Sequence, residues 1–119
     1  MSESLLESYD YSTNKYTRME GTEDWVEVAE LGDEMGGYDW TEFKAFYSPS
    51  ARRYFWHGGS GCSCNSWGED VHRAGDFEDG DRASLLRAWE SFAKDYEYSI
   101  PVSVYLAGVT EVRNFKETA

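Results

Sequence analysis

Residues 81–96 contain the pattern that most restricts how this chain can fold. Large apolar side chains recur there at intervals of three and four residues: Leu85, Leu86, Trp89, Phe92, Ala93 and Tyr96. This spacing places them on one side of an amphipathic helix, which must pack against a core. Asp79 or Asp81 can cap the N-terminus of the helix. We therefore expect a helix over 81–96 that covers a sheet.

Three segments before this helix have the composition of β-strands, because aromatic and β-branched residues dominate them. They are residues 25–31, 40–47 and 52–57. In the first, Trp25, Ala29 and Leu31 are expected on one face. A turn around Pro49 separates the other two and predicts a hairpin. Both faces of this hairpin carry aromatic side chains, so we expect neither face to be fully solvated.

The C-terminal segment permits two interpretations. Val102, Val104 and Leu106 alternate as in a strand, whereas Pro101 suits the first turn of a helix. We favour the helix. The expected fold is therefore α+β, with a three-stranded antiparallel sheet packed on one long amphipathic helix and a second C-terminal helix (or strand) beside it.

The length of 119 residues corresponds to one domain. We expect an acidic, tyrosine-containing N-terminal segment at 1–21 and a single α+β domain at 22–119. A polar segment of this composition is often disordered. Alternatively, its tyrosines form part of an added strand.

Both cysteines lie one residue apart, in the stretch Gly61, Cys62, Ser63 and Cys64 that follows further glycines. Glycines at this density indicate positive φ or close backbone approach. We expect a long loop over 58–79, in which the cysteines are architectural and Trp67 is an anchor. The N-terminus does not have the pattern of an export signal, so we expect a cytoplasmic protein with two free thiols.

A metal site is the alternative for this stretch. Cys62, Cys64, His57 and His72 supply the sulfur and nitrogen donors that zinc prefers. The Cys-x-Cys spacing is less typical of zinc sites than Cys-x2-4-Cys. A redox cysteine would have no basic residue beside it in the sequence. A nucleophilic Cys62 or Cys64 with His57 or His72 as its base is only a weak signal, because cysteine, histidine and carboxylates occur together in many unrelated chains. We therefore expect no metal, no cofactor and no catalytic residues, with zinc as the alternative.

The strands, the cysteine stretch and the helix together resemble an uncharacterised small domain family of actinobacteria and their bacteriophages. The matching pieces are residues 38–46, Arg53–Trp56, Gly61–Cys64 and Glu69–Asp70, within about residues 25–95. Where that family has a Pro-x-Pro-Phe-Glu stretch, residues 65–68 read Asn-Ser-Trp-Gly, and the tryptophan is expected to replace the phenylalanine. The resemblance implies a phage or actinobacterial accessory protein and carries no assigned activity.

The formal net charge of −12 is concentrated near the N-terminus, where residues 1–43 hold twelve acidic and two basic side chains. An acidic protein is repelled by phosphate backbones and by anionic membranes. We therefore expect no direct nucleic-acid partner and no membrane partner. In addition, no apolar run approaches the ~20 residues of a membrane-spanning helix.

Five tryptophans and nine tyrosines exceed what one small core requires, and both residue types are favoured at binding hot spots. We expect a non-enzymatic, phage-encoded accessory protein that binds a host protein in the host cytoplasm through an acidic and aromatic surface. The candidate partner-binding residues are Tyr9, Tyr11, Tyr16, Glu23, Asp24, Asp33 and Glu34. One alternative is a metal- or thiol-site protein that uses the Cys-x-Cys loop. Another is an acidic decoy of nucleic acid that occupies a basic protein site. The oligomeric state is left open.

Overall fold

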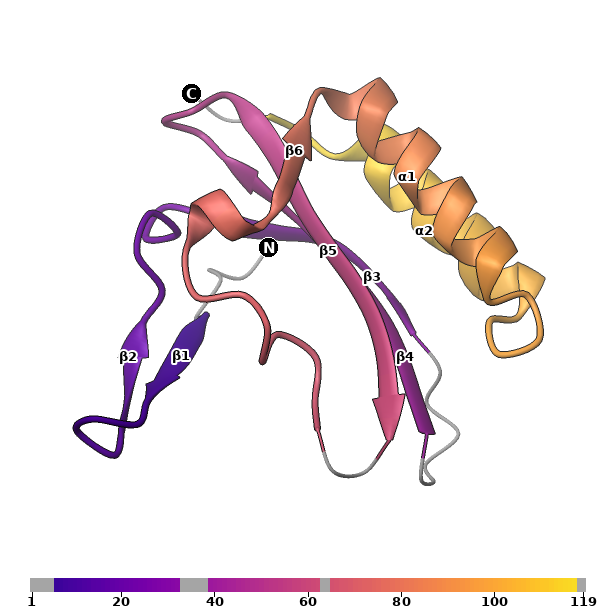
Figure 1. Ribbon diagram of the computed structural model, residues 1–119. Helices are drawn as coiled ribbons and strands as arrows, with labels where there is room; N and C mark the ends of the chain where they lie inside the picture. The colour runs from indigo at the N-terminus through magenta and orange to yellow at the C-terminus, as the bar shows by residue number, and fades with distance from the viewer. Residues whose placement is uncertain (1–5, 33–38, 63–64, 118–119) are drawn as a thin grey trace.

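The computed structural model describes residues 6–32, 39–62 and 65–117 (Figure 1). In chain order the elements are β1 (Glu7–Asp10), β2 (Lys15–Arg18), β3 (Val26–Gly32), β4 (Asp39–Ser48), β5 (Arg53–Cys62), a 3-10 turn (Ala74–Asp76), β6 (Glu78–Gly80), α1 (Arg82–Asp95) and α2 (Val102–Asn114). Strands β3, β4, β5 and β6 form an antiparallel sheet in that order, and β1 and β2 form a separate antiparallel pair.

The fold is α+β, but the prediction of a three-stranded sheet on one long helix is wrong. The described part of the chain contains six strands in two sheets, and its two helices have nearly equal lengths of 14 and 13 residues. Strand β6 consists of Glu-Asp-Gly, which has low strand propensity. Its pairing with Tyr54–Trp56 therefore comes from the tertiary fold rather than from its own residues.

The expected loop after residue 57 is also wrong at its start, because β5 continues to Cys62. Each residue of β5 pairs with one of β4, from Arg53 opposite Ser48 to Cys62 opposite Asp39. Glycines are needed in this part of β5 because neighbouring side chains pack directly against the backbone. A Cβ atom on Gly58 would lie 2.7 Å from a ring carbon of Phe92 in α1. Gly61 and Cys62 therefore belong to a strand, while Ser63 and Cys64 lie outside the described residues.

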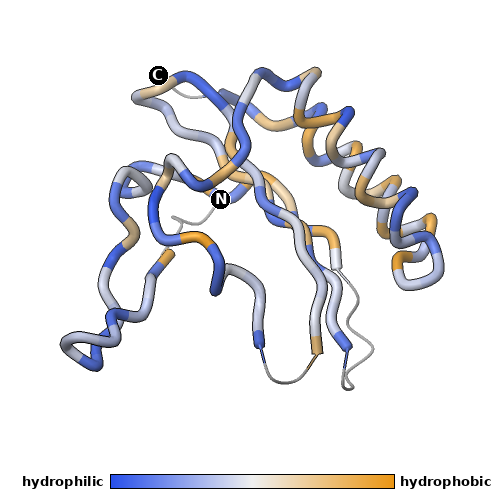
Figure 2. The backbone as a smooth tube through the Cα atoms, viewed as in Figure 1, coloured by the Kyte–Doolittle hydropathy of each residue, from blue (hydrophilic) through white to orange (hydrophobic). Residues whose placement is uncertain are grey.

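The two helices lie side by side on one face of the sheet (Figure 1). Apolar and polar residues alternate along both helices (Figure 2), and the apolar ones meet the sheet in the larger core. The fully buried members of this core are Leu31, Ala45, Leu85, Trp89 and Val112. Asp81 caps α1 by accepting a hydrogen bond from the Ser84 backbone N–H, with an N···O distance of 2.8 Å.

A smaller core covers the opposite face of the sheet. It contains Met19 and Trp25 from the connection between β2 and β3, Phe46 from β4, and Val71 and Phe77 from the connection between β5 and β6. The expectation that aromatic residues bury both faces of the β4–β5 hairpin is therefore correct.

A β-bulge explains why the residues of β3 do not share a face as expected. The pairing with β4 shifts between Glu27 and Ala29 and leaves Val28 as the extra residue. Trp25 consequently stacks on Phe46 in the smaller core, while Ala29 and other residues beyond the bulge face the helices. The bulge therefore separates Trp25, which directly precedes β3 and lies in the smaller core, from Ala29 and Leu31 of β3, which lie in the larger core.

Candidate functional site

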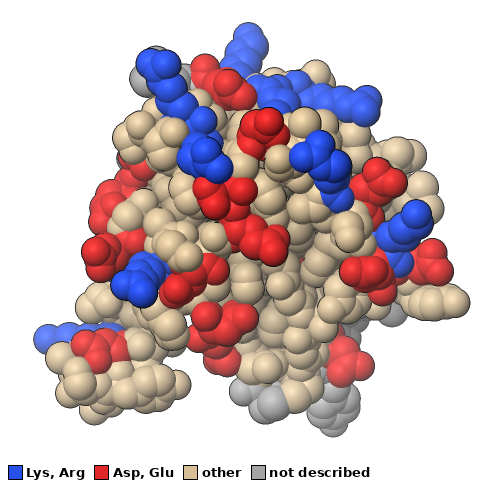
Figure 3. Space-filling view, turned by 45° about the horizontal axis from the view of Figure 1, so that its top comes forward, with Lys and Arg blue, Asp and Glu red and all other residues tan. Residues whose placement is uncertain are grey.

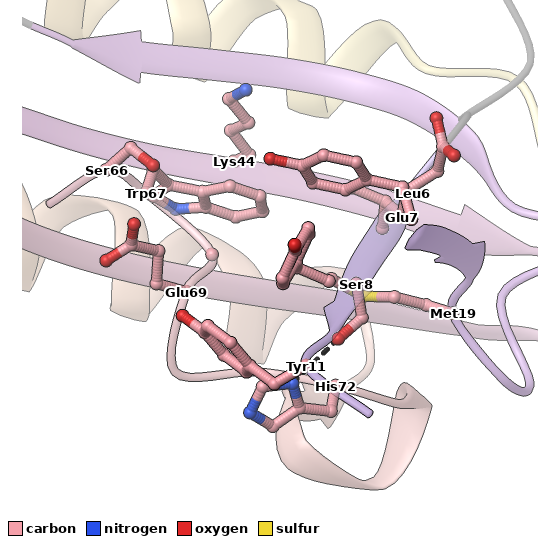
Figure 4. A pocket seen from close by; sticks show the side chains of 13 residues that line it. Leu6, Glu7, Ser8, Tyr11, Met19, Lys44, Ser66, Trp67, Glu69 and His72 are labelled. Carbon is pink, nitrogen blue, oxygen red and sulfur yellow. Dashed lines mark hydrogen bonds between the residues drawn. The ribbon is translucent and has the colours of Figure 1, made fainter. Parts of the chain in front are cut away.

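A groove of about 420 Å³ lies between the β1–β2 hairpin and the segment 66–72, beside the smaller core. We call it the tyrosine groove, after Tyr9, Tyr11 and Tyr16, which line it together with Trp67 and His72 (Figure 4). Strands from the N-terminus and a connection from the middle of the chain therefore form one concave surface.

The N-terminal hairpin holds its tyrosines in place through its turn. Asp10 Oδ1 accepts hydrogen bonds from the Ser12 backbone N–H at 2.9 Å and from Ser12 Oγ at 2.6 Å. These hydrogen bonds lower the pKa of the Asp10 carboxyl. Asn14 adopts a positive φ of 55° and accepts a hydrogen bond from the Tyr9 hydroxyl at 3.1 Å. The turn residues thus make a defined hairpin from a polar sequence.

The three tyrosines form a cluster with Tyr9 at its centre. The ring of Tyr9 meets Tyr11 edge-on at 4.8 Å and Tyr16 edge-on at 5.0 Å. Tyr16 lies opposite Tyr9 in the strand pairing. Tyr11 and Tyr16 are 84% and 68% exposed, respectively. The outer two rings therefore present aromatic surface to solvent while the inner ring supports them.

Trp67 forms the facing wall and is held from two sides. Its indole N–H donates to the His57 carbonyl at 3.0 Å, and its ring packs near Phe46 and Phe77. The ammonium of Lys44 lies 4.7 Å from the Trp67 ring centroid, a cation–π contact. Lys44 also faces Glu30 and Glu42 at 3.9 and 3.8 Å. The groove thus has its own cation beside the aromatic wall, and nothing in the sequence signals this long-range contact.

Ser8 and Glu20 tie the hairpin to the connection between β5 and β6, while Leu6 and Met19 join the two ends of the hairpin to each other. Ser8 Oγ lies 2.8 Å from Nδ1 of His72, a hydrogen bond that Figure 4 shows at the edge of the groove. The backbone N–H of Met19 donates to the Leu6 carbonyl, and that of Ala74 donates to the Glu20 carbonyl. The hydrogen bonds to His72 and Ala74 fix the hairpin against the segment between β5 and β6, so both walls of the groove are held in place.

The expected partner-binding residues do not all lie together. The three tyrosines meet in the groove, whereas Asp24 lies at the turn after β4. Its carboxylate accepts hydrogen bonds from the Ser50 backbone N–H at 2.8 Å and from Ser48 Oγ at 3.1 Å. Burial opposes the ionisation of Asp24, but these hydrogen bonds outweigh it and lower its pKa. Glu23 accepts from the backbone N–H of Gly21 at 3.2 Å. Asp33 and Glu34 lie outside the described residues.

The histidines of the metal alternative have separate partners. His57 Nε2 lies 3.0 Å from a carboxylate oxygen of Asp70, while His72 contacts Ser8. Within 6–32, 39–62 and 65–117, the His, Cys, Asp and Glu side chains form no group of three or more that could hold a metal ion. Cys64, the fourth proposed ligand, lies outside these ranges. The expectation of no cofactor stays a prediction.

Cys62 is not the free thiol that was expected, since it is disulfide-bonded. The end of β5 is held by two side chains that the sequence did not single out. Trp40 donates its indole N–H to the Cys62 carbonyl at 3.0 Å, and Asn65 accepts from the Cys62 backbone N–H at 3.2 Å. These hydrogen bonds join β4, β5 and the following segment.

The chain belongs to the family of the domain of unknown function DUF7574, whose family model matches residues 13–114. The match includes β2, the main sheet and both helices, and the family carries no named activity. Comparison with curated proteins and with solved structures gave no match. Neither described helix is long and apolar enough to cross a membrane.

Proposed function

We propose that the chain is a non-enzymatic protein-binding module whose tyrosine groove takes up a segment of a partner protein. The observation that carries the proposal is the pair of exposed rings, Tyr11 and Tyr16, set opposite Trp67 across a concave surface. Tyrosine and tryptophan supply large, rigid contact area at interfaces. Because Tyr11 and Tyr16 are mostly exposed, the core of this fold does not account for them.

The groove also offers charged groups around its aromatic rings. Glu7 and Glu69 line it together with Lys44, so a partner segment can meet both signs of charge at the rim, where charge guides association. Following the family resemblance, we propose that the chain is a phage-encoded accessory protein and that its partner is a host protein in the cytoplasm.

The alternative enzymatic interpretation of the groove is a serine hydrolase, because the side chains of Ser8 and His72 are within hydrogen-bond distance. A serine–histidine pair needs a third group that orients the imidazole. Asp76 is near in sequence, but it accepts from the backbone N–H of His72, at 2.9 Å, and not from its ring. We therefore interpret the Ser8–His72 contact as an anchor for the hairpin.

The decoy alternative receives no specific support from the described surface. Figure 3 shows acidic side chains spread over the face in view and interspersed with lysine and arginine. A decoy of nucleic acid would need a continuous field of one sign to match a basic binding site.

The proposal is tested by isolating partners from a bacterial host with the tagged wild-type chain and with a variant that carries Tyr11→Ala and Tyr16→Ala. We expect at least one protein, identified by quantitative mass spectrometry, to be retained by the wild type and reduced about tenfold or more by the double variant. Loss of two exposed aromatic contacts at a hot spot is sufficient for a change of this size.

The matched control is Tyr98→Ala, because Tyr98 is 99% exposed and does not line the groove. It should retain the partner at the wild-type level. Equal recovery with all three proteins, or no specific partner together with turnover of an ester or peptide substrate, would contradict the proposal.

A further inference from the structure

Two carboxylates line the tyrosine groove without an ion pair of their own. Glu7 in β1 and Glu69 in the connection between β5 and β6 are both exposed. Among the residues that the structure describes, no lysine, arginine or histidine lies within ion-pair distance of either. Arg18 is opposite Glu7 in the strand pairing, but its guanidinium donates to the Glu23 carbonyl at 3.3 Å.

The lysine of the groove is engaged elsewhere. The ammonium of Lys44 lies 4.7 Å from the ring centroid of Trp67 and faces Glu30 and Glu42 at 3.9 and 3.8 Å. Neither of these two glutamates lines the groove. The charge of Lys44 is therefore balanced outside the groove, and the carboxylates inside it can pair with a cation that a partner supplies.

Exposed aromatic rings accompany the carboxylates. Tyr11 and Tyr16 are mostly exposed, and Figure 4 shows the side chains of Tyr11 and Glu69 directed into the same part of the groove. A guanidinium group can stack on an aromatic face while its N–H groups, which lie in its plane, donate to a carboxylate. The groove thus presents the two kinds of group that an arginine side chain binds.

The molecule already contains one arginine bound in this way, on the far side of the fold. The guanidinium carbon of Arg82 lies 5.6 Å from the ring centroid of Tyr54, and Nη2 of Arg82 donates to Glu117 at 2.9 Å. One tyrosine ring and one glutamate therefore suffice to hold a guanidinium in this fold. The tyrosine groove offers the same two residue types to a partner.

We propose that the tyrosine groove recognises an arginine side chain in the partner segment, with the guanidinium stacked on Tyr11 and paired with Glu69. Lysine fits less well, because its ammonium is a compact, strongly hydrated charge that cannot stack on a ring. The net charge of −12 also favours the approach of a basic segment. This proposal rests on the proposed function of the groove and states the chemistry of the segment that binds there.

The probe is a short fluorescein-labelled peptide of alternating glycine and arginine, and its binding at low ionic strength is measured by fluorescence anisotropy. We expect it to bind about threefold to fivefold more tightly than the same peptide with lysine. Citrulline keeps the planar shape of arginine without its charge, so the citrulline peptide should bind about tenfold more weakly. Equal binding of the arginine and lysine peptides would overturn the proposal, because it would show attraction by charge alone.

Variants of the chain locate the binding. Glu69→Gln should weaken binding of the arginine peptide about threefold, and Tyr11→Ala should do the same. Glu111→Gln is the matched control, because it removes the same charge from an exposed site on α2, on the other side of the sheet. It should bind like the wild type. Equal weakening by Glu69→Gln and Glu111→Gln would also overturn the proposal.

Failure of this proposal can be told apart from failure of the proposed function. In the host pull-down, we expect Glu69→Gln to reduce recovery of the partner about threefold. Full retention by Glu69→Gln, together with loss by the variant that carries Tyr11→Ala and Tyr16→Ala, would overturn recognition of arginine and leave the groove as the binding surface. Full retention by the tyrosine double variant would instead contradict the proposed function itself, and with it this proposal.

Discussion

At the scale of single residues, Gly108 shows how closely the two helices and the core are packed. It is buried in α2, and a Cβ atom there would overlap Cζ2 of Trp89 and lie 2.6 Å from Cε2. Trp89 is fully buried and donates its indole N–H to the Tyr105 carbonyl at 3.2 Å. The indole therefore has no free space into which to withdraw.

We expect Gly108→Ala to lower the free energy of unfolding by about 1–3 kcal/mol, because overpacking outweighs the gain in helix propensity. The sign of this change in the free energy of unfolding is informative, since Gly→Ala in a solvent-exposed part of a helix is stabilising. Urea denaturation followed by tryptophan fluorescence measures it. Gly75→Ala is the control, because a Cβ atom at Gly75 meets no atom within 4 Å. A stabilised Gly108→Ala protein would show that α2 does not pack on Trp89 in this way.

At the scale of the elements, one carboxylate joins the start of α1, strand β5 and the segment after α2. Glu117 Oε2 accepts from the Tyr54 hydroxyl at 2.7 Å and from the Arg82 guanidinium at 2.9 Å. Arg82 also donates to the Arg113 carbonyl at 2.6 Å near the end of α2. The hydrogen bonds from Tyr54 and Arg82 lower the pKa of Glu117, while burial and the bond to Glu117 raise that of Tyr54.

We expect Glu117→Gln to reduce the stability by about 1 kcal/mol at neutral pH, a modest amount because the Glu117 side chain is 46% exposed. A lowered pKa in the folded state means that the ionised carboxylate contributes its stability above the unfolded value of 4.5, and that this contribution is lost as the pH falls through the folded value. Urea denaturation of both proteins at neutral pH and at about pH 3 tests this. A difference that does not shrink in acid would contradict the role of the ionised carboxylate.

The elements also show what local sequence can and cannot predict. The apolar spacing of 81–96 predicts α1 to within one residue at each end, because a single helix face meets the core. Strand β6 and the true end of β5 could not be predicted, because pairing across the sheet outweighs the weak propensities of Glu-Asp-Gly and of a glycine-rich segment. The bulge in β3 likewise depends on the register with β4.

At the scale of the whole molecule, the sheet is covered by helices on one face and by irregular segments on the other (Figure 1). The irregular segments do not cover their face of the sheet completely. The tyrosine groove is the space left between the N-terminal hairpin and the segment 66–72. The amino-acid composition predicted the tyrosines of this groove as candidate binding residues. Its opposite wall, with Lys44 against Trp67, could not be predicted, since it joins residues far apart in the sequence.

The most direct test of the account is photo-crosslinking with p-benzoylphenylalanine placed in turn at positions 11, 16 and 98 of the tagged chain in a bacterial host. Each position is exposed and already holds an aromatic residue, Tyr11, Tyr16 or Tyr98. We expect positions 11 and 16 to form an adduct with the same partner protein, and position 98 to form none. Adducts of equal yield at all three positions, or at position 98 alone, would contradict recognition by the tyrosine groove.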